Sequence, residues 1–507
     1  MIISLSVLVI TIIVSGTYAL YKAQLSKNIG VNTTTHGLAY YINYVKGTDI
    51  TAATLNPSTS YEGGASSDIE FWKKDDSYDI YGKIELTVNT IGTNLSNSPA
   101  LKYAVVNNGN VLKEGSLKGT TSGSKVTILK NLYLEQTKQI YTVYVWLDNS
   151  EELGNISNES LSISVDCTAS LQKEPTAADT IISLYTSAAK VTATNNSITY
   201  NTAPSVSLMN DRLGGTTTSL DGGNIRYYGA SPNNYIYFNC SDYSNQTSST
   251  CETWRIIGVF DGKLKLIRGS QIGKYSWDNK NISTGAENNF GKNDWTTARL
   301  MKLLNPRDYY KVDSNDNNLG QSLYYNSASG KCYSGQNNAT VDCDFTSTGI
   351  KNDETRNMIA ETTYYLGGWN SYSVYPNEIY EYERGTTVYT GRPPTWPGKI
   401  ALAYPSDYGY AADLNQCKDK TLYDYDNSTC TSNNWMKAIL GTSSHGWLLT
   451  PRSGGSYNAW NVYSGGYVGS TYLAYYAIGA VPVLSLSSKL GIESGDGSSS
   501  NPYKLSA

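Results

Sequence analysis

The chain contains two stretches in which hydrophobic and polar positions follow one another differently. In the first, short runs alternate apolar and polar residues between turn-formers. These runs are IYGKIELTVNT (80–90), LKYAVVNNGNVLKEG (101–115), KVTILKNLYL (125–134), IYTVYVWLDN (140–149) and LSISVDC (161–167). Alternation with a period of two is typical of half-buried β-strands, and Asn108-Gly109 is a strong hairpin signal. The pattern predicts a β-sandwich over residues 23–167.

The second stretch mixes strand patterns with helical ones. Strands are expected at NYIYFNC (234–240), TWRIIGVF (253–260) and KLKLIRGS (263–270), and strands and turns from GKIALAYPSDYGYA (398–411) to AVPVLSLSS (480–488). Helical spacing predicts helices at 295–305 and 355–367. We therefore expect an α+β domain over residues 223–507.

Residues 168–222 separate the two stretches. TAADTIISLYTSAAK (176–190) follows Pro175 and has apolar residues at the spacing of a short helix. GGTTTSLDGG (214–223) is rich in Gly and Thr and is typical of a loop. These residues are predicted to form a helix-containing linker.

The start of the chain is apolar. Residues 2–19, IISLSVLVITIIVSGTYA, carry no charge, and 1–22 is predicted to be a signal or transmembrane helix. Thr17 and Ala19 are small residues that suit cleavage after Ala19, whereas the length of the run favours a retained single-pass anchor. No second run of spanning length follows, so everything after residue 22 is expected on one side, at the extracellular face of the membrane or the cell surface.

Composition narrows the classes of partner. The 507 residues have a net charge of −4 and only 16% charged side chains, so no basic field is present to attract nucleic acid. Tyrosine is abundant, with 44 copies against 5 phenylalanines. Tyrosine packs its ring and keeps a hydroxyl for water or a ligand. Most of these rings are expected in β-sheet cores and on sheet faces, and the remainder in a recognition surface.

Six of the seven cysteines form three close pairs in the sequence. They are Cys240 and Cys251, Cys332 and Cys343, and Cys417 and Cys430, each pair enclosing a loop of turn-formers. Six cysteines allow 15 connectivities, but pairing of nearest neighbours needs the least chain travel. Three such disulfides predict an oxidising compartment. Cys167 is left over and is expected to be a free buried thiol at a strand end, with an intermolecular bridge as the alternative.

Known catalytic and metal-binding patterns are missing from the sequence. It contains no HExxH, GxSxG or P-loop motif. DSNDNN (313–318) begins like a calcium loop but lacks the glycine at its sixth position, and Tyr324 stands where the bidentate glutamate belongs. His445 has no evident nucleophile or carboxylate partner in the sequence. We expect no enzyme activity, no cofactor and no metal, although an extracellular enzyme with an unrecognised site is a third alternative.

The remaining candidate site is a set of aromatic residues in the last quarter of the chain. The wider set is Trp396, Tyr404, Tyr408, Tyr410, Trp460, Tyr463, Tyr467, Tyr472, Tyr475 and Tyr476, near Arg384, Arg392, Asp407 and Arg452. Aromatic faces beside polar groups suit glycan stacking or protein contacts, whereas the alternation in WNVYSGGYV suits a strand whose rings are core. The predicted ligand-binding residues are Trp396, Tyr408, Tyr410, Arg452, Trp460, Tyr463 and Tyr467.

Residues 205–505 resemble an uncharacterised domain in surface proteins of gut-dwelling Gram-positive relatives of the mollicutes. The resemblance is carried by GNIRYYGASPNNYIYFN (223–239), WRIIGVFDGKLKLIR (254–268), IGKYSWDN (272–279), RGTTVYTGRPPTWPGKIALAYPSDYGYA (384–411), WLLTPRS (447–453) and AVPVLSLSSKLGIESGDGSSSNPYKL (480–505). More distantly, the ending is similar to C-type-lectin-like folds, which implies that a late strand closes the domain against its start. Neither resemblance implies a particular chemistry.

The first stretch resembles camelysin and biofilm-fibre subunits more loosely. The features are GTYALYK (16–22) after the apolar leader, DIEFWKK (68–74) and YGKIELTVN (81–89). This resemblance implies a jelly-roll-like sandwich. Together the observations favour a cell-surface binding or adhesion protein with a β-sandwich stalk, whose partner is a glycan or a protein at the cell exterior. The alternative is a structural subunit of a surface or biofilm fibre.

Overall fold

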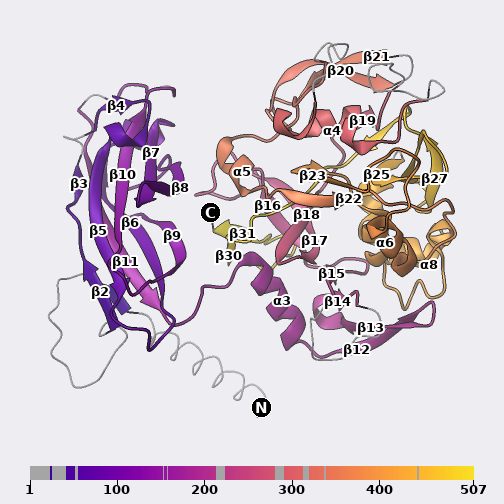
Figure 1. Ribbon diagram of the computed structural model, residues 1–507, viewed down its shortest axis with the longest axis horizontal. Coiled ribbons are helices and arrows are strands. Elements are labelled where there is room, and N and C mark those ends of the chain that lie inside the picture. Colours follow the sequence, from indigo (N-terminus) through magenta and orange to yellow (C-terminus); the bar gives the residue numbers. More distant parts are fainter. Residues whose placement is uncertain are drawn as a thin grey trace. The chain divides into compact units, whose positions relative to one another are not determined.

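A computed structural model describes residues 23–25, 41–51, 55–151, 153–156, 158–212, 223–279, 290–311, 319–335, 338–441 and 445–506. The chain divides into two compact units, Met1–Glu174 and Pro175–Ala507 (Figure 1). The predicted leader helix at 1–22 lies outside the described residues. Within the described ranges, we find no helix that is both long and apolar enough to span a bilayer.

The first unit consists of two β-sheets. One has the order β1 (Ala23–Leu25), β11 (Leu161–Ser170), β6 (Tyr81–Ile91) and β9 (Lys125–Tyr133), with β3 (Ile50–Thr51) also on β11. The other has the order β2 (Ile42–Val45), β5 (Ala65–Lys73), β10 (Ile140–Asp148), β7 (Leu101–Asn107) and β8 (Asn110–Ser116), with β4 (Pro57–Ser58) on β10. The described part of the unit also contains the 3-10 helix η3 (Tyr61–Gly63) and the short helix α2 (Thr93–Asn97).

One hydrophobic core joins the two sheets. Strands β5 and β6 bury alternate residues, among them Ile69, Phe71, Ile84 and Leu86, which are fully buried in the same cluster. A period of two places every second side chain on one face, so each sheet turns its apolar face to the other. The arrangement agrees with the β-sandwich predicted for residues 23–167.

The β7–β8 hairpin has the two-residue turn that Asn108-Gly109 predicts. Both residues have positive φ, 50° and 76°, and Asn107 pairs with Asn110. Two consecutive left-handed residues give the turn whose twist matches that of paired strands.

The N-terminal strands pair within their own unit. Strand β1 is antiparallel to β11, and β2 is antiparallel to β5. The described strands between residues 20 and 45 are therefore paired within their own unit. This bears on the fibre hypothesis, because a strand donated to another copy would be unpaired here.

Cys167 is a free, fully buried thiol, as predicted. It lies inside β11 opposite Ile84, and β11 continues to Ser170, so its expected place at a strand end is wrong. The strand continues through Thr168 and Ala169 because they pair with Lys83 and Gly82 of β6. Burial raises the pKa of the thiol well above its usual value, so the group is uncharged and unreactive.

The second unit contains two larger sheets. The nine-stranded sheet has the order β12 (Val191–Asn195), β13 (Ile198–Ala203), β14 (Leu208–Asn210), β15 (Ile225–Tyr227), β17 (Glu252–Phe260), β18 (Lys263–Arg268), β29 (Val483–Ser485) and β24 (Ile400–Ala401), with β16 (Tyr235–Phe238) on β17. The five-stranded sheet has the order β19 (Gly273–Ser276), β28 (Ala477–Ala480), β25 (Gly446–Pro451), β26 (Asn458–Val462) and β27 (Val468–Leu473).

Hairpins and short helices surround these sheets. The hairpins are β20 (Ser329–Gly335) with β21 (Ala339–Asp344), β22 (Thr362–Tyr365) with β23 (Thr395–Gly398), and β30 (Gly491–Ser494) with β31 (Lys504–Ser506). The α-helices are α3 (Ala177–Ser187), α4 (Arg299–Leu304), α5 (Asp353–Met358), α6 (Pro376–Arg384), α7 (Pro405–Tyr410), α8 (Ser428–Ser432) and α9 (Lys437–Leu440). The 3-10 helices are η4 (Pro204–Val206), η6 (Trp295–Thr297), η7 (Arg307–Tyr309) and η9 (Leu422–Asp424).

The segment predicted as a linker, 168–222, is not one over its described part. Helix α3 forms as expected, with a capping box between Thr176 and Asp179, but it packs on β15, β17, β18 and β30. Strands β12, β13 and β14 extend the nine-stranded sheet. Ile181 and Tyr185 are buried in the main core of the second unit, so burial of this apolar face makes the helix part of the domain.

Two local predictions in the second unit are corrected. The helix expected at 355–367 ends at Met358, and residues 362–365 form β22 instead. Pairing of Tyr364 with Trp396 favours the strand over the helical spacing. Helix α7 forms where strands and turns were predicted, and α6 lies in a stretch for which no element was predicted. Each begins with a proline followed by an acidic residue, Glu378 or Asp407, that caps its first turn.

The end of the second unit packs against its beginning. Strand β31 contacts β16, β30 contacts α3, and Ala177 N–H donates to the carbonyl of Leu490. Both chain ends of the unit are thus tied into the same region (Figure 1).

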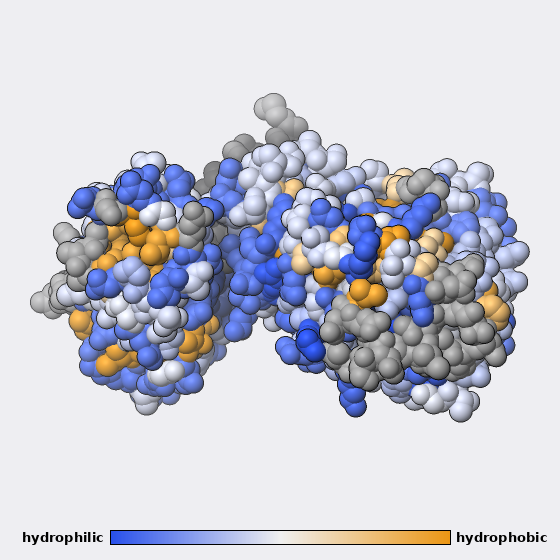
Figure 2. All heavy atoms as spheres, turned by 90° about the horizontal axis from the view of Figure 1, so that it is seen from above, coloured by the Kyte–Doolittle hydropathy of each residue, from blue (hydrophilic) through white to orange (hydrophobic). Residues whose placement is uncertain are grey.

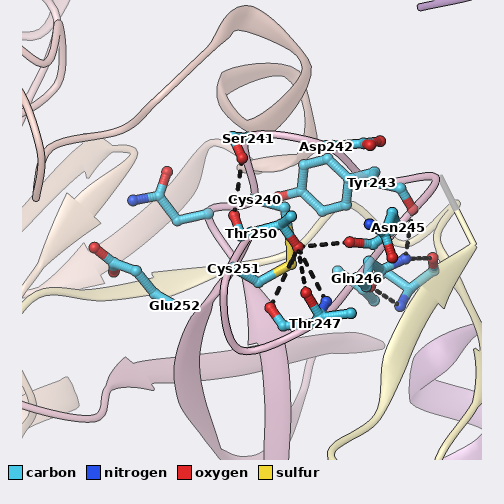
Figure 3. The surroundings of a disulfide bond; sticks show 12 residues. Cys240, Ser241, Asp242, Tyr243, Asn245, Gln246, Thr247, Thr250, Cys251 and Glu252 are labelled. Carbon is cyan, nitrogen blue, oxygen red and sulfur yellow. Dashed lines mark hydrogen bonds between the residues drawn. A yellow bond between two sulfur atoms is a disulfide. The ribbon is translucent and has the colours of Figure 1, made fainter. Parts of the chain in front are cut away.

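The three predicted disulfides are confirmed: Cys240–Cys251, Cys332–Cys343 and Cys417–Cys430. The first closes a loop that is also ordered by hydrogen bonds (Figure 3). The Thr250 hydroxyl donates to the carbonyl of Asn245, and Gln246 exchanges two hydrogen bonds with the backbone of Leu505. These hydrogen bonds therefore stabilise both the loop and the position of β31 beside it. Disulfides at these three places indicate an oxidising, extracellular environment.

Candidate functional site

A continuous strip of aromatic rings reaches the surface of the second unit. We call it the tyrosine strip. Its members are Tyr372, Tyr423, Tyr467, Tyr463, His445, Tyr472 and Tyr476. In that order, the centroids of neighbouring rings lie 4.1 to 5.6 Å apart. All seven side chains keep some exposure to solvent, and Tyr423 is 46% exposed.

The edge of the five-stranded sheet positions the centre of the strip. Tyr463 directly follows β26 and Tyr467 directly precedes β27, and the backbone N–H of Tyr463 donates to the carbonyl of Tyr467. Residues 464–466 make the turn, where Gly466 has a φ of +106°. This cross-strand pairing brings the two rings face to face, with centroids 4.1 Å apart and planes 13° apart. Only one face of each ring is then left for another contact.

A buried tyrosine supports this turn from below. Tyr408 in α7 is fully buried, and its hydroxyl donates to the carbonyl of Gly466 over 2.7 Å. A carbonyl buried in a turn needs such a partner. Tyr408 therefore positions the strip without belonging to it.

His445 lies inside the strip. Its Nδ1 accepts a hydrogen bond of 3.0 Å from the backbone N–H of Ser464, which leaves the proton of the neutral ring on Nε2. Its ring contacts Tyr463 at 4.5 Å and Tyr472 at 5.2 Å. Burial lowers the pKa of His445, so the imidazole is neutral at neutral pH.

The centre of the strip, Tyr463, Tyr467, Tyr472 and His445, is electrically neutral. Burial is the largest cause that raises the pKa of Tyr463, Tyr467 and Tyr472, so all three phenols stay protonated. A neutral imidazole lies among them. The surface therefore combines apolar ring faces with uncharged hydroxyl groups.

Four of the seven predicted ligand-binding residues belong to the core, and this part of the prediction is wrong. Trp396, Tyr408, Tyr410 and Trp460 are at most 4% exposed. Trp396 packs against Trp295 and Tyr364, with its indole N–H donating to the carbonyl of Tyr309. Strand β26 is buried along its whole length, which includes Trp460, and helix α7 is buried at Tyr408 and Tyr410.

Arg452 lies at the other end of the β25–β26 pair from the Tyr463–Tyr467 turn. In the β25–β26 pair, Gly446 is opposite Val462, whereas Pro451 is opposite Ala459. Arg452 follows Pro451, and its guanidinium donates to the side chain of Asn370 over 2.8 Å. The structure thus brings together only Tyr463 and Tyr467 of the predicted set.

The sequence analysis included some of the other members of the strip and missed the rest. Tyr472 and Tyr476 are in the wider candidate set, but His445, Tyr372 and Tyr423 are not. The YSGGY sequence carried a usable signal, because tyrosines on either side of a tight Gly-Gly turn are cross-strand neighbours. Tyr372 and Tyr423 come from loops distant in sequence, and no local pattern joins them to the turn.

Two small pockets in the structure are lined by residues outside the strip. One pocket of about 20 Å³ is lined by residues such as Lys83, Asn131 and Gln172, and another of about 10 Å³ by Arg299 and Tyr333. Each has room for about one water molecule. Among the described residues, no three His, Cys, Asp or Glu side chains are grouped to hold a metal ion. The candidate calcium loop at 313–318 lies outside the described residues.

The visible surface of the molecule is mostly hydrophilic. Figure 2 shows apolar side chains in separate patches among polar ones. The most exposed large hydrophobic residues include Tyr78 and Val111 in the first unit and Val191 and Tyr423 in the second. Of these, Tyr423 belongs to a contiguous aromatic surface.

No protein family matches the sequence, and no curated protein matches it either. Solved structures give faint similarity. A mutant of HCR/D and the receptor binding domain of botulinum neurotoxin mosaic serotype C/D are each 11% identical to this chain. Each match covers 52% of this chain and 75% of the other, with a TM-score of 0.15. A likeness of this size carries no argument about fold or function.

Proposed function

We propose that this chain is an exported cell-surface binding protein whose second unit binds glycans through the tyrosine strip. The first unit serves as a β-sandwich stalk. The observation that carries the proposal is the strip itself: seven contiguous aromatic rings, all partly exposed. Ring faces that could have been buried in the core are instead offered to solvent.

The chemistry of the strip favours a neutral glycan. A sugar ring has an apolar C–H face and hydroxyl groups at its edge, which match a tyrosine ring and its phenol. The phenols of Tyr463 and Tyr467 are uncharged, and the imidazole of His445 is neutral. The stacked pair Tyr463–Tyr467 gives a rigid platform, since its rings are fixed by the turn between β26 and β27. Rigid aromatic side chains bind at a low cost in conformational entropy.

The place of action follows from the disulfides and the leader. Three disulfides fit an extracellular position, and the apolar leader at 1–22 would serve as a signal or a single-pass anchor. The resemblance of residues 205–505 to a domain of bacterial surface proteins supports the same proposal. We assign the chain no reaction, because its sequence contains none of the catalytic motifs considered above.

The proposal does not depend on fibre formation. Strands β1 and β2 pair within the first unit, so these described strands are not free to complete another copy. A fibre would have to use other edges, and electron microscopy of the purified protein under assembly conditions distinguishes filaments from monomers.

The test is a glycan array probed with the purified full chain, followed by titration calorimetry on any glycan that binds. Tyr423→Ala and Tyr467→Ala should each weaken binding by roughly tenfold, since each removes one stacking ring. Tyr78→Ala is the matched control, because Tyr78 is 44% exposed and Tyr423 is 46% exposed. Tyr78 lies in the first unit and should leave binding unchanged.

Two results would count against the proposal. One is an array without any binding glycan. The other is a glycan whose affinity falls equally in the Tyr78 variant and the strip variants, which would place binding elsewhere.

A further inference from the structure

A group of ionised side chains is buried in the second unit, away from the tyrosine strip. Lys265 in β18 and Asp407 in α7 form an ion pair through Nζ and Oδ2, and their side chains are only 7% and 0% exposed. Arg226 in β15 lies on the other side of Asp407, with its Nη1 donating to Oδ1 over 3.0 Å. Asp211 pairs with Arg226 at 2.5 Å.

The surroundings of Lys265 are aromatic. Its Nζ lies 4.9 Å from the ring centre of Phe260 and 4.5 Å from that of Tyr404. Burial lowers the pKa of Lys265 to about 8, in spite of the neighbouring carboxylate. Burial also opposes the ionised form of Asp407, but the charges of Lys265 and Arg226 outweigh it and lower the pKa of that carboxyl. The proton that the carboxyl needs therefore comes from the Lys265 ammonium, which burial makes easier to deprotonate.

We propose that Lys265 and Asp407 condense into an amide, an isopeptide bond between their side chains. The free amine of Lys265 forms a bond from Nζ to Cγ of Asp407, and the bond from Cγ to Oδ2 breaks. Oδ2 leaves as water, carrying the carboxyl proton and one proton from the nitrogen. No oxidant, reductant or second protein is needed.

The contacts of Asp407 fit this step. Arg226 donates to Oδ1, the oxygen that stays as the amide carbonyl, and so stabilises the negative charge that develops there during attack. Lys265 contacts the oxygen that leaves. The backbone N–H of Tyr404 also donates to that oxygen over 2.9 Å, and this hydrogen bond is lost in the product.

The charges left behind remain balanced. Condensation removes one buried cation and one buried anion together. Arg226 keeps Asp211 as its partner, and Arg384 keeps Glu383 at 3.2 Å. Removing a buried ion pair also removes its desolvation cost.

The bond would join two elements that are far apart in the chain. Lys265 lies in β18 of the nine-stranded sheet, and Asp407, in helix α7, is 142 residues further on. Such a link restricts the unfolded chain in the way that a long-loop disulfide does, but it resists reduction.

The test is a peptide map of the full chain after reduction, alkylation and digestion with trypsin. Trypsin does not cleave after a lysine whose side chain is an amide. We therefore expect residues 264–268, uncleaved at Lys265, joined to residues 400–418, with a mass equal to the sum of the two peptides less one water. Fragmentation should place the link on Lys265 and Asp407.

The chain provides its own control. Lys73 is also buried and pairs with Asp76 at 2.8 Å, but Asp76 is 70% exposed, so trypsin should cleave after Lys73 as usual. In Lys265→Met and Asp407→Ala, the joined peptide should be absent. If either variant fails to fold, the digest of the unmodified chain still decides.

Cleavage after Lys265 together with an unlinked 400–418 peptide of full mass overturns the proposal. Loss of water within an unlinked peptide also overturns it, because the water would then come from a different reaction. The outcome is independent of glycan binding.

Discussion

Tyr408 and Tyr467 contact the same turn but have different environments. Tyr408 is fully buried and donates its hydroxyl to the carbonyl of Gly466, whereas Tyr467 is partly exposed and stacks on Tyr463. A buried hydroxyl with a partner stabilises the fold, and an exposed ring is available for a ligand. Residue type alone does not separate these cases, because both are tyrosines in turn-rich sequence.

The Tyr408 hydroxyl is the first feature to test at this scale. Tyr408→Phe leaves the buried carbonyl of Gly466 without its partner, so we expect the free energy of unfolding to fall by about 1–3 kcal/mol. The measurement is urea unfolding followed by tryptophan fluorescence. Tyr324→Phe is the control, since Tyr324 is fully buried and its hydroxyl has no hydrogen-bond partner among the described residues. A loss of equal size in both variants would contradict the assigned role.

Glu383 predicts a pH dependence of stability. Burial raises its pKa to about 7 from a usual value of 4.5, despite the charge of Arg384 and the hydrogen bonds from Ser406. The folded state therefore binds more protons than the unfolded state between these values. Its contribution to stability is complete below about pH 4.5 and is lost as the pH rises through about 7.

Glu383→Gln should remove this dependence. Plotted from about pH 4.5 to 7, the free energy of unfolding should slope downward less steeply in the variant than in the original chain. Glu381→Gln removes a charge from the exposed side of the same helix and should keep the original slope. An unchanged slope in the Glu383 variant would show that the carboxyl does not titrate in this range.

At the scale of elements, the sequence was most informative where one local rule decides the structure. The turn at Asn108-Gly109 and the helix starting after Thr176 both form where predicted. Prediction was poorest where tertiary contacts override local spacing. Residues 362–365 have helical spacing, but the pairing of β22 with β23 makes them a strand. The same limit explains the candidate site, since burial of Trp396 depends on rings distant in sequence.

The β7–β8 turn gives a prediction at this scale. Gly109 has a φ of +76°, and an added Cβ would meet nothing within 4 Å, so Gly109→Ala introduces conformational strain without a clash. We expect a loss of about 1 kcal/mol in the free energy of unfolding. Gly335→Ala is the control, because a Cβ there also meets open space and no left-handed φ is involved. Equal effects of the two changes, measured in urea, would exclude a conformational origin.

At the scale of the whole molecule, the two units rely on different means of stabilisation. All three disulfides are in the second unit, and the free Cys167 is in the first. The first unit has regular strands around one core, which is why the alternating pattern predicted it well. The second unit has long loops, short helices and strands joined across large separations, so its residues 175–212 could not be assigned to it from local pattern.

Thiol counting tests this division directly. Reaction with a thiol reagent should find no reactive cysteine in the native chain, because Cys167 is fully buried and the other six are paired. Denaturation without reductant should release one thiol per chain. More than one would show that a disulfide is absent, and none would show that Cys167 forms a bridge to another molecule.

Reduction should then weaken the second unit selectively. Each disulfide closes a loop of 11 to 13 residues, which is worth about 3 kcal/mol by the chain-entropy relation. Trp72 and Trp146 are the only tryptophans of the first unit among the 10 in the chain, so fluorescence mainly follows the second unit. With a phosphine reductant, the urea midpoint from fluorescence should fall, whereas the midpoint from alkylation of Cys167 should stay unchanged. A parallel fall of both midpoints would mean that the first unit depends on the second for its stability, and the disulfides would then support the whole chain.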